Sequence, residues 1–135
     1  MCTRLINFLD KNKIFYDKQF GFRAKHSTDL AIVSIIDKIQ TAIDTKNYAC
    51  GIFLDFSKAF DTVNHKILIQ KLEYYGIRGV AKDWFSSYLQ NRQQFVTVNN
   101  VKSDPLSISC GVPQGSVLGP VLFLLYRLSS LLFFL

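Results

Sequence analysis

The sequence predicts a mixed fold, α+β or α/β, in which helices and strands form layers around one core. Three features of the 135 residues support this: helical periodicity recurs along the chain, one short apolar run lacks it, and two segments near residue 100 are typical of a hairpin. Hydrophobic residues make up 49% of the chain, which is enough to bury a core. Wholesale disorder is therefore excluded.

Two helices are predicted before residue 47, over residues 3–12 and 29–45. Ser27 or Thr28 can cap the second helix. Apolar residues recur every three or four positions in both segments, so each helix is predicted to bury one face. They are Leu5, Phe8 and Leu9 in the first helix and Leu30, Val33, Ile36, Ile39 and Ile43 in the second.

The middle of the chain predicts one strand and two further helices. Residues 48–56 form a short apolar run without helical period, which predicts a buried strand that ends near Asp55. Amphipathic helices are predicted over residues 65–75, where Gly76 ends the helix, and over residues 80–90.

The last third predicts a hairpin, a loop and a final helix. Residues 94–100 and 105–109 are typical strands, with the polar residues 101–104 between them. Residues 111–120 are rich in glycine and proline and predict a loop, after which an apolar helix begins near Pro120.

Charge and cysteine content indicate the kind of partner and compartment. The formal net charge is +6, which favours polyanionic partners such as nucleic acid or anionic lipid. Cys2, Cys50 and Cys110 are scattered and odd in number, which suits a reducing compartment. No secretion signal is recognisable at the start of the chain. We therefore expect a cytoplasmic and nuclear location.

The apolar end of the chain, residues 117–135, has the length of a membrane span. Arg127 lies near its middle and Pro120 near its start, and both disfavour a span. We therefore expect no stable membrane association, and a tail-anchored membrane protein remains a minor alternative.

Asp55 is the strongest chemical candidate, because an acid that ends a buried strand needs a cation or hydrogen bonds to offset its desolvation. A structural acid that caps the next helix is an equally good interpretation. Phe60, taken alone, is typical of a core aromatic residue. Asp61 and Asn64 can simply cap the helix that begins near residue 65.

Two loops offer further candidates. In GVPQGS the glycines let the backbone approach a ligand, and Gln114 can both donate and accept hydrogen bonds. In the earlier basic and aromatic stretch, Arg23 and Lys25 can bind phosphates while Phe20 and Phe22 stack on bases. Taken alone, that stretch is better explained by surface charges and core phenylalanines. No zinc-site, protease or phosphate-loop motif occurs in the chain.

Three segments together resemble the reverse transcriptase domain of non-LTR, LINE-type retrotransposons, with the jockey-like branch nearest. They are QFGFRAKHST, IFLDFSKAFDTVNH and GVPQGSVLGPVLF, in this order. The resemblance runs from about residue 4 to Tyr126. It implies a partial right-hand polymerase, with a fingers-side segment over residues 1–46, a palm with motifs A and B over residues 47–126, and an aberrant apolar tail over residues 127–135.

The resemblance also implies a Mg²⁺-dependent site that adds deoxynucleoside triphosphates to a primer 3′-hydroxyl on an RNA template. LDFSKAFD resembles motif A, so Asp55 matches the catalytic, metal-binding aspartate. The carbonyl oxygen of Phe56 then matches a second metal ligand. Phe60 matches the steric gate that crowds a ribose 2′-hydroxyl and thereby favours deoxynucleotides.

The remaining implied contacts belong to motif B and to the fingers. GVPQGS resembles motif B, which places Gln114 and Gly115 beside the nucleotide sugar and the templating base. GFRAKHST resembles a fingers segment, in which Arg23 and Lys25 face the template or the nucleotide. The implied partners are an RNA template, a DNA primer and a deoxynucleoside triphosphate.

The sequence also departs from this pattern. It holds no Asp-Asp pair of the kind found in motif C, and the early fingers residues that grip the triphosphate would precede residue 1. A lone carboxylate binds Mg²⁺ weakly. We therefore expect a chain truncated at both ends that does not polymerise by itself. The alternative is a non-catalytic, basic remnant that binds nucleic acid.

Overall fold

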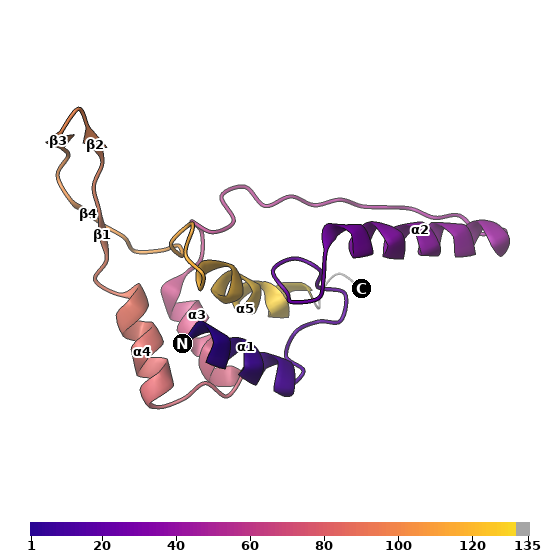
Figure 1. Cartoon of the computed structure of the whole chain (residues 1–135), viewed down its shortest axis with the longest axis horizontal. Helices are drawn as coiled ribbons and strands as arrows, with labels where there is room; N and C mark the ends of the chain where they lie inside the picture. Colours follow the sequence, from indigo (N-terminus) through magenta and orange to yellow (C-terminus); the bar gives the residue numbers. More distant parts are fainter. Residues whose placement is uncertain (132–135) are drawn as a thin grey trace. The chain divides into compact units, whose positions relative to one another are not determined.

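The computed structural model describes residues 1–131, in which helices are joined to two short antiparallel ribbons (Figure 1). The predicted α+β class is confirmed. In chain order the elements are α1 (Cys2–Lys11), α2 (Thr28–Asp44), α3 (His65–Tyr74), α4 (Val80–Leu89), β1 (Gln93–Gln94), β2 (Thr97–Val98), β3 (Val101–Lys102), β4 (Leu106–Ser107) and α5 (Gly119–Leu131).

The chain divides into two compact units. The first contains Met1–Asn7 and the residues from Lys58 onward, and the second contains Phe8–Ser57, so α1 crosses the boundary. The fingers-side and palm segments drawn from the sequence follow different boundaries, and that division stays a prediction. Residues 132–135 of the predicted aberrant tail lie outside the described residues, whereas residues 127–131 continue α5.

The first unit holds most of the apolar core, because α3 packs against both α4 and α5. Asn64 caps α3 by accepting a hydrogen bond from the Ile67 amide at 3.2 Å, as the sequence suggested. The helix ends before Gly76, whose φ of +92° suits the reversal that follows. Buried side chains in this unit are Leu5, Val63, Leu68, Leu72, Ile77, Phe85, Leu89, Val112, Leu118, Val121, Leu122, Leu124, Leu125 and Leu128.

The hairpin is confirmed, but the predicted turn was wrong. β1 pairs with β4, and β2 pairs with β3 at the tip of the same hairpin (Figure 1). The reversal lies at Asn99 and Asn100, whose φ angles are +49° and +65°. Asparagine tolerates this left-handed region, which a tight two-residue hairpin turn requires. Residues 101–102, predicted to lie between the strands, belong to β3.

Helix α2 is confirmed, but its predicted buried face was wrong. Ser27 caps the helix by accepting a hydrogen bond from the Leu30 amide at 3.3 Å. None of the 17 residues of α2 is buried. No described segment covers the apolar positions of this helix. The exposed fractions of the five predicted core residues run from 42% at Ile39 to 62% at Ile43.

The buried strand predicted over residues 48–56 is not formed. The described residues include no strand partner for this segment, and a strand needs one for its backbone hydrogen bonds. The side chains are exposed as well, with Ile52 at 83% and Phe53 at 86%. The apolar run therefore indicates a segment that could be buried, but nothing in the described structure buries it.

Candidate nucleotide-binding site

Backbone hydrogen bonds join the segment after Asp55 to the loop that contains Gln114. The amide of Gly111 donates to the carbonyl oxygen of Val63 at 2.7 Å, and the amide of Val112 donates to that of Phe60 at 2.9 Å. Asn64 and Cys110 form an isolated antiparallel bridge. Two segments about fifty residues apart in sequence are thus fixed side by side in the first unit.

Gly111 allows this close approach. A Cβ atom at this position would lie 3.0 Å from the carbonyl oxygen of Asp61, and the φ angle is +92°. Any side chain would therefore be strained and would push the two segments apart. The His65 imidazole Nε2 lies 2.6 Å from the Gly111 carbonyl oxygen and donates to it in the Nε2–H tautomer.

Asp61 orients the side chain of Gln114. The Gln114 Nε2 atom donates a hydrogen bond to Asp61 Oδ1 at 3.0 Å. An ionised carboxylate only accepts, so the glutamine must turn its NH₂ group toward Asp61. The other amide hydrogen and Oε1 form no hydrogen bond with the described residues. The glutamine therefore keeps one donor and one acceptor for a ligand.

Sequence reasoning missed this role of Asp61, which it assigned to helix capping. Asn64 alone fills that position, at the residue that directly precedes α3. The presence of two capping candidates for one helix start was the signal that one of them had another partner. Nothing in the local sequence identified Gln114 as that partner, because the contact spans 53 residues.

The rest of the loop forms a closed turn that leads into α5. Ser116 Oγ donates to the Pro113 carbonyl oxygen at 2.7 Å and accepts from the Gly119 amide at 2.9 Å. Gly115 has a φ of +76°, which a residue with a side chain rarely adopts. The turn is therefore fixed by its own hydrogen bonds.

A cavity of about 590 Å³ lies beside Gln114. Asp61, Arg92, Gln94 and residues 107–114 line it, and we call it the Arg92–Gln114 cavity. Ligand pockets typically measure about 300–1,000 Å³. The cavity is therefore large enough for a nucleotide unit.

Phe60, the predicted steric gate, is half-buried in the first unit. Its ring centroid lies 5.0 Å from that of Phe123 on α5, with the two rings tilted by 43°. This contact fixes one side of the ring. Its role toward a ribose stays a prediction.

Asp55 and Phe56 lie in the second unit, within the segment that forms no strand, and both are exposed. The described residues contain no group of three or more His, Cys, Asp or Glu side chains that could hold a metal ion. Within residues 1–131 the structure therefore brings Gln114 together with Asp61 but assembles no such group around Asp55. The assignments of these two residues as metal ligands stay predictions.

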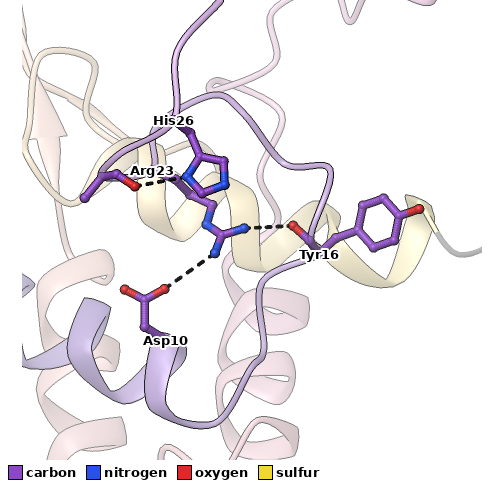
Figure 2. A network of polar contacts seen from close by, with 5 residues as sticks. Asp10, Tyr16, Arg23 and His26 are labelled. Atoms are coloured by element: carbon purple, nitrogen blue, oxygen red, sulfur yellow. Dashed lines mark hydrogen bonds and ion pairs between the residues drawn. The ribbon is translucent and has the colours of Figure 1, made fainter. Parts of the chain in front are cut away.

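The Arg23 side chain is fixed by contacts with other residues of the second unit (Figure 2). Its Nη1 donates to the Tyr16 carbonyl oxygen at 2.9 Å, and its Nη2 lies 3.8 Å from Asp10 Oδ1. The guanidinium also lies 5.2 Å from the ring centroid of Phe15. These contacts order the loop between α1 and α2. Lys25, by contrast, is exposed.

The chain belongs to the family described as reverse transcriptase (RNA-dependent DNA polymerase), which matches residues 1–131. This match confirms the resemblance found in the sequence motifs. No helix among the described residues is both long and apolar enough to cross a membrane. No solved structure matches the chain.

The chain is similar to curated polymerases of mobile elements. It is 39% identical over 129 residues to the probable RNA-directed DNA polymerase from transposon BS of Drosophila melanogaster, covering 91% of this chain and 14% of that protein. It is 37% identical to the RNA-directed DNA polymerase from mobile element jockey of the same species, covering 90% of this chain and 13% of that protein. The chain thus spans about one seventh of the relatives it matches.

Proposed function

We propose that this chain supplies the motif A and motif B region of an RNA-directed DNA polymerase, with an RNA template, a DNA primer and a deoxynucleoside triphosphate as partners. The observation that carries the proposal is the joining of the two motif regions in the first unit. The segment after Asp55 is hydrogen-bonded to the loop of Gln114, and Asp61 orients the Gln114 amide. Family membership supplies the class of reaction.

Gln114 and Gly115 contact the incoming nucleotide in this proposal. The Gln114 amide can offer one N–H and one oxygen to a base or sugar, because its other N–H is held by Asp61. The Phe60 ring, supported by Phe123, limits the space beside the ribose. Arg23 and Lys25 belong to the loop assigned to template or nucleotide. Arg23 orders that loop, and exposed Lys25 offers its charge to a phosphate.

Magnesium suits the chemistry of Asp55 and Phe56, because a carboxylate and a carbonyl are the hard oxygen ligands it prefers. The donor set, however, contains only one carboxylate. The described residues supply no cluster of three acidic or imidazole groups. The residues present therefore do not fit a two-metal site, and no catalytic step is assigned to this chain's residues through the metal.

The first test is primer extension on an RNA template by the isolated chain, with Mg²⁺ and deoxynucleotides. We expect no extension, because one carboxylate holds Mg²⁺ weakly. The Asp55→Asn variant is the comparison. Extension by the original chain that the variant abolishes would contradict this expectation. Extension that persists in the variant would remove Asp55 from the site.

The second test restores the missing context. The part of this chain that matches the transposon BS polymerase, at 39% identity, replaces the corresponding region of that protein. We expect an active chimera in which Asp55→Asn lowers extension about 100-fold or more, because a lost metal ligand removes several kcal/mol of charge stabilisation.

The matched control for the chimera is Asp37→Asn, which removes an exposed carboxylate from α2 and should leave the extension rate unchanged. Equal rates for the Asp55 and Asp37 variants would contradict the proposal. That result would favour the alternative of a basic, non-catalytic nucleic-acid-binding segment.

A further inference from the structure

Residues 48–55, which we call the 48–55 segment, are apolar and have no backbone partner among the described residues. No backbone hydrogen bond joins the segment to the rest of residues 1–131. Its side chains are exposed as well: Tyr48 is fully exposed and Leu54 is 64% exposed. The segment contains no proline, and its one charged side chain is Asp55. It therefore presents two strand edges that are free to pair.

The 48–55 segment already has the character of a strand. Its residues include isoleucine, phenylalanine, leucine and tyrosine, which favour strands. Left-handed residues stand on either side of it, Lys46 with a φ of +57° and Lys58 with a φ of +52°, but none lies within it. A Cβ atom at Gly51 would lie 3.2 Å from Phe53 Cε2, so positions 51 and 53 share one side of the chain, as alternate residues of a strand do. Little reordering is therefore needed for pairing.

We propose that the 48–55 segment pairs with the same segment of a second copy of this chain, in antiparallel orientation. The charges at its two ends carry this choice of partner. In the register centred between Cys50 and Gly51, Lys46 of each copy lies beside Asp55 of the other. Opposite charges that face each other across two strands stabilise the pair. The segment is therefore complementary to itself.

The same register matches the apolar side chains. Tyr48 faces the partner's Phe53, and Ala49 faces the partner's Ile52. Aromatic and apolar pairs across two strands add to the stability of a sheet. A sheet of only two strands is marginal in water, but each copy keeps a second free edge. Further copies therefore add to the first pair.

Other arrangements lose the charge pairs. Parallel, in-register pairing would place Lys46 beside Lys46 and Asp55 beside Asp55, and like charges in these positions repel. A shift of the antiparallel register by one residue would place Lys46 beside an apolar residue and would turn every other side chain to the opposite face. The centred antiparallel register is therefore favoured.

The test is the association of the intact 135-residue chain over a range of concentrations. Sedimentation velocity gives the mass of the assemblies, and infrared spectroscopy gives their strand content. We expect both to rise together with concentration. Lys46→Glu should lower the association constant about tenfold, because two attractive pairs become repulsive. Parallel pairing would not be weakened, since like charges would face each other before and after the change.

The matched control is Lys38→Glu, which makes the same change of net charge at an exposed position of α2. We expect no weakening, because this variant leaves the charges beside the 48–55 segment intact. The double variant Lys46→Glu/Asp55→Lys exchanges the two charges and keeps them opposite. It should restore the association constant to within about twofold of the original.

Ile52→Pro tests the backbone pairing itself. Proline lacks the amide hydrogen and does not fit a strand that is paired on both sides. We expect the concentration-dependent strand signal to disappear. The helical circular dichroism at low concentration should stay unchanged, because the Ile52 backbone forms no hydrogen bond with the described residues. This second measurement separates lost pairing from lost folding.

The inference would be overturned by an original chain that does not associate, or by equal association constants for Lys46→Glu and Lys38→Glu. Association that survives Ile52→Pro but is lost in Ile36→Glu would also overturn it, because the contact would then belong to the exposed face of α2. None of these measurements requires a template, a primer or a nucleotide. The result therefore stands or falls independently of the proposed polymerase function.

Discussion

Helices α2 and α5 are both rich in aliphatic side chains, yet only one of them is buried. Five side chains of α5, from Val121 to Leu128, are buried, and α3 packs against this helix. Helix α2 is longer and buries no residue. The comparison shows that an apolar helix face favours burial but does not identify the segment that buries it. For α5 the partner is supplied within the described chain.

The extended segments show the same difference. The polar residues Gln93 and Gln94 are paired in a ribbon, because their partner strand β4 is the other arm of the same hairpin. Residues 48–56 are far more apolar and remain unpaired with the described residues. A local hairpin carries its own partner, whereas a buried strand needs strands from elsewhere in a sheet.

The largest expected effect separates the two helices by stability. Leu122 is fully buried, so Leu122→Ala should lower the free energy of unfolding by about 2–5 kcal/mol. Ile36 is 58% exposed, so Ile36→Ala should change it by about 0.5 kcal/mol or less. Urea unfolding followed by circular dichroism measures both. Equal losses would break the comparison, since they would mean that α2 is buried in solution.

Sequence alone predicted three of the helices closely. Residues 3–12, 65–75 and 80–90 differ from α1, α3 and α4 by at most one residue at each end. Periodicity, the Asn64 cap and Gly76 are local signals that act within a turn or two of the chain. The final helix likewise begins at Gly119, one residue before the proline that marked it.

What sequence missed depended on contacts between distant residues. The exposure of α2, the missing strand over residues 48–56 and the Asp61–Gln114 hydrogen bond could not be predicted from local patterns. Each depends on whether a residue distant in the sequence comes into contact. The motif resemblance predicted the family, which the comparisons confirm. The role that it implies for Gln114 stays a prediction, and it gave no reason for Asp61. The stacking of Trp84 on Tyr88 was also missed, although their spacing of four residues within one predicted helix was visible in the sequence.

The second expected effect concerns the accessibility of the backbone. Brief chymotrypsin digestion should cleave after Phe53, which is 86% exposed, more than tenfold faster than after Phe85, which is 1% exposed. Cleavage at the first site needs no unfolding, whereas the second becomes accessible only when the packed unit opens. Mass spectrometry of the earliest fragments checks the order. Simultaneous cleavage at both sites would show that the two regions open together.

The smallest expected effect sharpens the packed side of the comparison, at the junction of α3 with α5. The Lys71 Nζ donates to the Tyr126 carbonyl oxygen and lies 5.0 Å from the Tyr126 ring centroid. Burial, and then the charge of Arg127, lower the pKa of Lys71 below its ordinary value. The folded chain therefore loses this proton at a lower pH than the unfolded chain.

Between the lowered pKa of Lys71 and its ordinary value, the unfolded state binds more protons, so the free energy of unfolding should rise with pH. Tyr75 acts in the opposite sense, because burial, and then Tyr74, raise its pKa and stability falls above the ordinary tyrosine value. Urea unfolding in a Tyr75→Phe background isolates the lysine. Lys71→Met should abolish the rise, whereas Lys66→Met, at an exposed position of α3, should retain it. A rise that survives Lys71→Met would assign it to another group.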